Sequence, residues 1–127
     1  MFPCNFRTWY AVNFGPQVLA LAQEKKMGII ALKSMADTTW PQNADRSKYK
    51  KCWYEPLTNE ADILRGLRFT LSHPVTTLIP PGEPQLFRTA LNLSNQIKPL
   101  TNEELEILKI KALYGDPLFK YPLANPI

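Results

Sequence analysis

The apolar positions of the chain alternate between short continuous runs and longer stretches with helical spacing. The short runs are FPCNF (residues 2–6), GIIALKSMA (28–36) and VTTLI (75–79). The stretches that follow them, in which apolar residues recur every three or four positions, begin at Pro16, Thr58 and Pro84. Repeated β-then-α units favour a parallel sheet with helices packed outside it. We therefore predict an α/β fold with about three parallel strands, outer helices and a C-terminal helix.

The helical segments carry recognisable start and stop signals. The first begins at Pro16 and is expected to end at Gly28, and the second is expected to be capped by Thr58. The third begins at Pro84 and is expected to run to about Ile97. A last helix opens with Thr101-Asn-Glu-Glu104, which predicts a capping box.

Three stretches lack such periodicity. Residues 7–16 are predicted to be a loop, and residues 115–127 an extended, proline-rich tail. Residues 37–57 are predicted to form one long loop between a strand and a helix, with four aromatic residues among basic ones. A loop of that length in a compact domain is usually functional or disordered, and its aromatic content argues against disorder.

The 127 residues have the length of a single domain, and their net charge of +4 is mild. Neither a nucleic-acid face nor a membrane span is indicated, because the basic residues are scattered and no apolar run approaches ~20 residues. The start of the chain lacks a basic region followed by an apolar one, so a cytoplasmic protein is expected. Cys4 and Cys52 are expected to be free thiols, although a disulfide between them stays open. With one histidine in the chain, zinc is not expected.

The carboxyl ends of the three strands are expected to share one rim, where chemistry sits in parallel α/β folds. The N–H groups around Gly82 to Gln85, at a helix N-terminus, favour an anion such as phosphate, or the Pro-Pro-Gly corner simply turns the chain. Lys33 either pairs with an anion, forms a desolvated amine or reaches solvent, and Arg88 either reaches the same anion or forms a surface ion pair. His73 lies at the opposite end of a strand and is expected to be an ordinary turn residue.

The residues contain no G-x-S-x-G, P-loop or dinucleotide glycine triplet. However, the segments FPCNF, GIIALKSMA, ILRGLRFTLSHP, VTTLIPPGEPQLFRTAL and TNEELEIL, taken in this order, resemble the C-terminal third to half of an aldo/keto reductase. The resemblance covers residues 2 to about 108. It implies that the three strands correspond to strands six to eight of a (β/α)8 TIM barrel that reduces carbonyl groups with a nicotinamide dinucleotide.

The resemblance also implies roles for individual residues in binding NADP(H) or NAD(H). Lys33, Ser34 and Met35 are expected beside the nicotinamide and pyrophosphate. The corner and the helix after it are expected on the adenosine phosphate side, through Pro81, Gly82, Glu83, Gln85 and Arg88. The choice between NADPH and NADH stays open, because Arg88 and Thr89 occupy the positions of a Glu-Asn pair that is common in the family.

The catalytic Asp, Tyr, Lys and His of the family belong to earlier strands, and no residue of this chain matches them. We therefore expect residues 1–127 to form a single incomplete domain that binds the cofactor and is inactive alone. Three parallel strands leave two unpaired edges, so the N-terminal part of a barrel or a second copy is expected to cover them. The alternative is a non-catalytic barrel remnant that binds an anion or another protein.

Overall fold

Three parallel strands form the central sheet. In the computed structural model, which describes residues 1–120, these strands are β1 (Phe2–Pro3), β2 (Ile30–Leu32) and β5 (Thr77–Leu78). They lie in the order β1-β2-β5, with Phe2 paired to Ala31 and Ile30 to Thr77. The prediction of an α/β fold with three parallel strands is confirmed, and the described strands do not close into a barrel.

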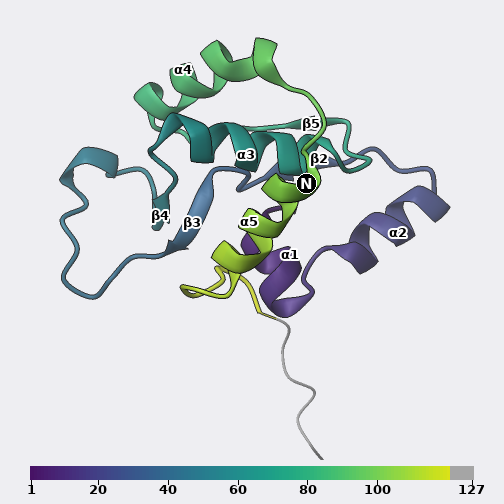
Figure 1. The fold of residues 1–127 in the computed structure, drawn as a ribbon, viewed down its shortest axis with the longest axis horizontal. Helices are drawn as coiled ribbons and strands as arrows, with labels where there is room; N and C mark the ends of the chain where they lie inside the picture. Colours follow the sequence, from purple (N-terminus) through teal and green to yellow (C-terminus); the bar gives the residue numbers. More distant parts are fainter. Residues whose placement is uncertain (121–127) are drawn as a thin grey trace, which may run out of the picture.

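Within residues 1–120 five α-helices accompany the strands (Figure 1). They are α1 (Phe6–Val12), α2 (Pro16–Glu24), α3 (Glu60–Leu71), α4 (Pro84–Leu93) and α5 (Asn102–Ala112). No helix within residues 1–120 has the length and apolar character needed to cross a membrane.

The prediction of a loop over residues 7–16 is wrong, because α1 occupies most of it. The Asn5 side chain accepts a hydrogen bond from the backbone N–H of Thr8 and so caps the helix. Asn13 ends the helix in the left-handed conformation, with φ of 52°. The helix has only two turns, so its apolar period is too short to stand out in the sequence.

The prediction of one irregular loop over residues 37–57 is also wrong. Strands β3 (Ala36–Thr39) and β4 (Tyr54–Pro56) pair there as an antiparallel hairpin, with a 3-10 turn at Ser47–Tyr49 between them. The Trp40 indole N–H donates to the Cys52 carbonyl oxygen at 2.9 Å and links the two arms. The hairpin projects to one side of the molecule (Figure 1).

The ends of the other helices differ from the predictions by a few residues. Asn59, not Thr58, caps α3, because its side chain accepts from the N–H groups of Ala61 and Asp62. Helix α2 ends at Glu24, and α4 ends at Leu93 before a 3-10 turn at Ser94–Gln96. The capping box of α5 is confirmed, with Thr101 and Glu104 each bonding the other's backbone N–H. Residues 115–120 of the predicted tail contain no helix or strand, and residues 121–127 lie outside the described part.

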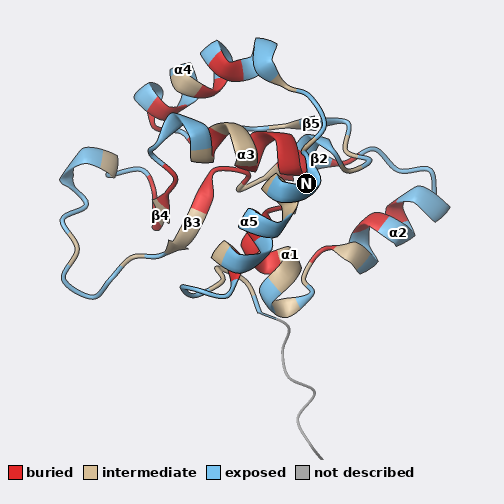
Figure 2. Cartoon of the chain, in the orientation of Figure 1, coloured by how far each residue is buried: buried red, intermediate tan, exposed pale blue. Residues whose placement is uncertain are grey.

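The two faces of the parallel sheet are covered unequally. On one face Cys4 and Ala31 are fully buried and pack with Leu19 and Ala22 of α2. On the other face, which alternate residues of the strands reach, Ile30 is 37% and Ile79 44% exposed. The buried segments gather instead where α3, α4 and the β3–β4 hairpin meet (Figure 2). This second face is therefore largely exposed within residues 1–120, and we call it the bare face of the sheet.

Two buried arginines fasten helix α5 to the rest of the fold. The Arg7 guanidinium forms an ion pair with Asp37 and donates to carbonyl oxygens at the end of α5, including that of Lys111 at 2.7 Å. The Arg68 guanidinium donates to both carboxylate oxygens of Glu104, at 2.6 and 2.8 Å, and to the Pro99 carbonyl. Each buried charge is thus paired and hydrogen-bonded, as burial requires.

Candidate functional site

The carboxyl ends of β2 and β5 lie at one edge of the sheet, because neighbouring parallel strands end on the same side. This edge carries residues 33–36 after β2 and residues 79–83 after β5. The side-chain amide of Asn5, just after β1, donates to the carbonyl oxygens of Lys33 and Ala36 at 3.2 and 3.3 Å. The three strand ends therefore form one rim. The Asn5 side chain connects the end of β1 to the residues that follow β2.

Lys33 adopts a left-handed backbone with φ of 67°, which is uncommon for a residue other than glycine. Its Nζ lies 4.7 Å from the ring centroid of Tyr54 and 5.3 Å from that of Trp53. Burial lowers the pKa of the Lys33 amine, and the neighbouring Cys52 thiol acts in the opposite direction. Within residues 1–120 no carboxylate pairs with this amine, and the aromatic rings of the hairpin are its partners.

Ser34 and Met35 are both buried behind Lys33. The Ser34 hydroxyl has no hydrogen-bond partner in the described part of the chain, although the residue is only 1% exposed. Met35 lies in the main core, with no exposed surface. The cofactor-binding roles expected for the two residues stay predictions, and the unpaired hydroxyl is the feature that a polar ligand would satisfy.

At the second corner of the rim, the loop of the hairpin is tied to the start of α4. The Glu83 carboxylate accepts from the backbone N–H of Lys51, and the Gln85 side chain donates to the Lys48 carbonyl oxygen at 3.0 Å. Pro81 is buried, whereas Gly82 is exposed with open space around its Cα. The helix start is thus exposed at Gly82, and the loop is hydrogen-bonded to it through the buried Glu83 and the exposed Gln85.

Arg88 lies on α4 one turn beyond Gln85, with an exposed side chain and no ion pair within residues 1–120. Residues three apart on a helix share a face, so Arg88 and Gln85 lie on the same side of α4. The structure does not bring Arg88 into contact with Lys33. A ligand that engages both must span the rim.

Cys52 lies between the two corners of the rim, and its coupling to Lys33 and Glu83 was not predicted from the sequence. Burial raises the pKa of its thiol, the Glu83 carboxylate raises it further, and the Lys33 amine and a hydrogen bond with Tyr54 lower it. Cys52 therefore lies within the electrostatic reach of both Lys33 and Glu83. Cys4 is likewise a free buried thiol, with a pKa raised to about 12 by burial, so the expectation of two free thiols is confirmed.

The rim offers the Lys33 amine and the N–H groups at the start of α4, which together suit an anion, and the unpaired Ser34 hydroxyl is buried behind them. Burial and the Cys52 thiol raise the pKa of the Tyr54 phenol, which lies beside Lys33. His73 follows α3 as a turn residue, with its ring 4.1 Å from that of Trp9. Residues 1–120 contain no group of acidic, histidine and cysteine side chains that would hold a metal ion. Comparisons with protein-family models, curated proteins and solved structures found no match to this chain.

Proposed function

We propose that this chain is the C-terminal, cofactor-binding portion of an NAD(P)H-dependent aldo/keto reductase. The observation that carries the proposal is the order β1-β2-β5 of parallel strands, with Lys33, Ser34 and the start of α4 at their carboxyl ends. This is the arrangement of three consecutive strands in a (β/α)8 barrel, in which ligands bind at that end.

The bare face of the sheet supports completion by further strands. Parallel sheets are normally covered on both faces, yet here Ile30 and Ile79 of one face are exposed. Strands β1 and β5 also have unpaired edges within the described residues. In a closed barrel the same face fills the interior and the edges pair with neighbouring strands.

The donors at the rim fit a dinucleotide diphosphate. The Ser34 hydroxyl lacks a partner, and a phosphate oxygen is a strong acceptor for it. The Lys33 amine would exchange weak contacts with two rings for a charge-assisted bond to the pyrophosphate. The start of α4 and Arg88 would hold the adenosine phosphate side. The bound cofactor supplies the hydride, whereas the residues of the rim bind and orient it.

The chain alone is expected to bind cofactor without reducing a carbonyl substrate. Reduction requires a group that protonates the carbonyl oxygen, and Tyr54, the phenol nearest the rim, is buried with a raised pKa. The proton donor is therefore assigned to strands that complete the barrel.

Titration of the protein with NADPH and with NADH, followed by backbone amide NMR shifts, tests the proposal. The shifts are expected at residues 33–36 and 82–88. The variant Lys33→Gln is expected to weaken binding about tenfold, because it removes a charge-assisted hydrogen bond. Lys25→Gln, at the exposed end of α2, is the matched control. The proposal fails if neither dinucleotide shifts the rim, or if the two variants bind equally.

A non-catalytic module that binds an anion or another protein is the second candidate, and the bare sheet face favours it. Such a module would recognise phosphate without the rest of the dinucleotide. Inorganic phosphate that shifts the same residues with an affinity equal to that of NADPH and NADH would select this candidate.

A further inference from the structure

Helix α5 has a second apolar face, which stays exposed within residues 1–120. The inner face of the helix holds Leu108 and Ala112, its two buried residues. The outer positions of α5 and of the two residues after it are exposed (Figure 2), and they carry four large apolar side chains, Ile107, Ile110, Leu113 and Tyr114. We propose that this outer face, which we name the α5 stripe, pairs with the α5 stripe of a second copy of the chain in an antiparallel dimer.

The spacing of the α5 stripe is that of a helix–helix contact. Ile107, Ile110 and Tyr114 follow one another at intervals of three and four residues, as apolar residues do along the seam between paired helices. A surface helix normally has one polar face, whereas a helix with apolar residues on both sides is typical of the interior of an assembly. The α5 stripe thus has the pattern of a packed surface.

The charges of α5 favour a second copy, in antiparallel orientation, as the partner. Glu103 and Glu106 lie in the first half of the helix and Lys109 lies in the second half, and all three are exposed. About a two-fold axis the start of one α5 lies against the end of the other, so Glu106 of each copy faces Lys109 of the other. The opposed helix dipoles add to this attraction. A parallel pairing would instead bring like charges together.

Glu106 and Lys109 already form an ion pair within α5, with 2.6 Å between the Lys109 Nζ and the Glu106 Oε1. Residues three apart share one side of a helix, so this pair lies along one border of the α5 stripe. An exposed pair of this kind contributes little by itself. In the dimer each carboxylate would contact two ammonium groups, one from each copy, in a network of four alternating charges shielded from water.

The fold holds the α5 stripe rigidly. The Arg68 guanidinium binds Glu104 at the start of the helix, and the Arg7 guanidinium binds the Lys111 carbonyl oxygen at its end. A surface that is fixed before pairing loses little conformational entropy. The 11 residues of α5 extend over about 16 Å, so the contact is smaller than a standard interface. We therefore expect a weak dimer, with a dissociation constant on the order of 10–100 µM.

Analytical ultracentrifugation of the full chain, at concentrations on both sides of that value, is expected to show a reversible monomer–dimer equilibrium. The variant Ile110→Lys is expected to weaken the dimer at least about tenfold, because it places a charge in the apolar contact. Leu91→Lys on α4 is the matched control, since Leu91 is 56% exposed and Ile110 57%, and it is expected to leave the dimer unchanged. A chain that stays monomeric, or a dimer that Ile110→Lys does not weaken more than Leu91→Lys, overturns the proposal.

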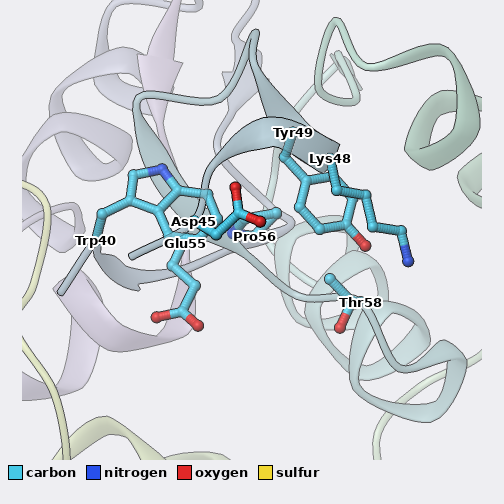
Figure 3. Close-up of a pocket in the computed structure, with 7 residues that line it drawn as sticks. All are labelled: Trp40, Asp45, Lys48, Tyr49, Glu55, Pro56 and Thr58. Carbon is cyan, nitrogen blue, oxygen red and sulfur yellow. The ribbon is translucent and has the colours of Figure 1, made fainter. Parts of the chain in front are cut away.

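Charge reversal tests the antiparallel orientation. Glu106→Lys and Lys109→Glu each place like charges opposite one another, so each is expected to weaken the dimer about tenfold. An equimolar mixture of the two variants is expected to regain the affinity, because the two substituted side chains then face each other and so do the two native ones. Lys48→Glu on the β3–β4 hairpin, where Lys48 is exposed beside Tyr49 (Figure 3), is the charge-reversal control and is expected to have no effect. A mixture that dimerises no better than either variant alone contradicts the pairing.

Discussion

At Gly66 the backbone of α3 passes so close to the turn after β2 that a side chain has no room. A Cβ there would lie 2.5 Å from the Ser34 carbonyl oxygen and 3.0 Å from Cδ1 of Leu57. Ordinary helix propensity favours alanine over glycine by about 1 kcal/mol, but a backbone oxygen cannot rotate away. This contact therefore sets the distance between α3 and the rim.

The variant Gly66→Ala is expected to lower the free energy of unfolding by about 1–3 kcal/mol, because α3 must move away from the rim. Urea denaturation followed by circular dichroism measures it. Gly82→Ala is the matched control, since no heavy atom lies within 4 Å of its added Cβ, and it is expected to be neutral or slightly stabilising. If the Gly66 variant proves as stable as the Gly82 variant, α3 is not in close contact with the rim.

At the scale of elements, local signals were predictable from the sequence and non-local ones were not. The capping box of α5 is read directly, because Thr101 and Glu104 act on each other within one turn. The β3–β4 hairpin is not readable, since its pairing joins strands separated by a polar loop and depends on Trp40 reaching Cys52. Likewise Lys33 is a candidate from the sequence, but its aromatic partners Trp53 and Tyr54 are brought to it only by the β3–β4 hairpin.

The start of α5 predicts an acid-sensitive stability. Hydrogen bonds from Arg68 and from the Thr101 backbone lower the pKa of Glu104 to about 2, against 4.5 for the ordinary carboxyl group. A lowered pKa means that the unfolded chain binds the proton more readily, so the stabilisation is full above pH 4.5 and is lost as pH falls toward 2. Protonation would also leave the buried Arg68 without its counter-charge.

We expect the urea midpoint of the protein to fall between pH 5 and 2, and the variant Glu104→Gln to show a weaker fall from a lower starting value. Glu106→Gln is the control, because its partner Lys109 is 47% exposed and such surface pairs contribute little. Parallel pH profiles for the wild type and the Glu104 variant would show that Glu104 is not the residue responsible.

At the scale of the whole molecule, the sheet has one core face and one bare face. Two neighbouring residues of β2 lie on opposite faces and differ in exposure. Ala31 has no exposed surface and packs with Cys4 and Leu19, whereas Ile30 points the other way and is 37% exposed. A continuous apolar run such as residues 29–32 is typical of a strand covered on both faces, so the sequence does not distinguish the two residues. The difference is thus visible only in the assembled fold.

The variant Ile30→Thr is expected to change the free energy of unfolding by less than about 0.5 kcal/mol, as at other surface sites, and to reduce binding of a hydrophobic dye such as ANS. Ala31→Thr, one residue further, is expected to lower the free energy of unfolding by about 1–3 kcal/mol because the core has no room for it. Equal effects of the two substitutions on stability would mean that both faces of the sheet are covered in solution.

The Arg7 guanidinium makes the packing of α1 depend on a segment that is synthesised much later. Its hydrogen-bond acceptor at Lys111 lies 104 positions further along the chain, and a ribosome delivers the N-terminal segment first. Until that late segment emerges, the cation has the side chain and carbonyl of Asp37 as partners but lacks its acceptors at the end of α5, so its complete burial carries a cost. Helix α1 is therefore expected to reach its final packing only after α5 has been synthesised.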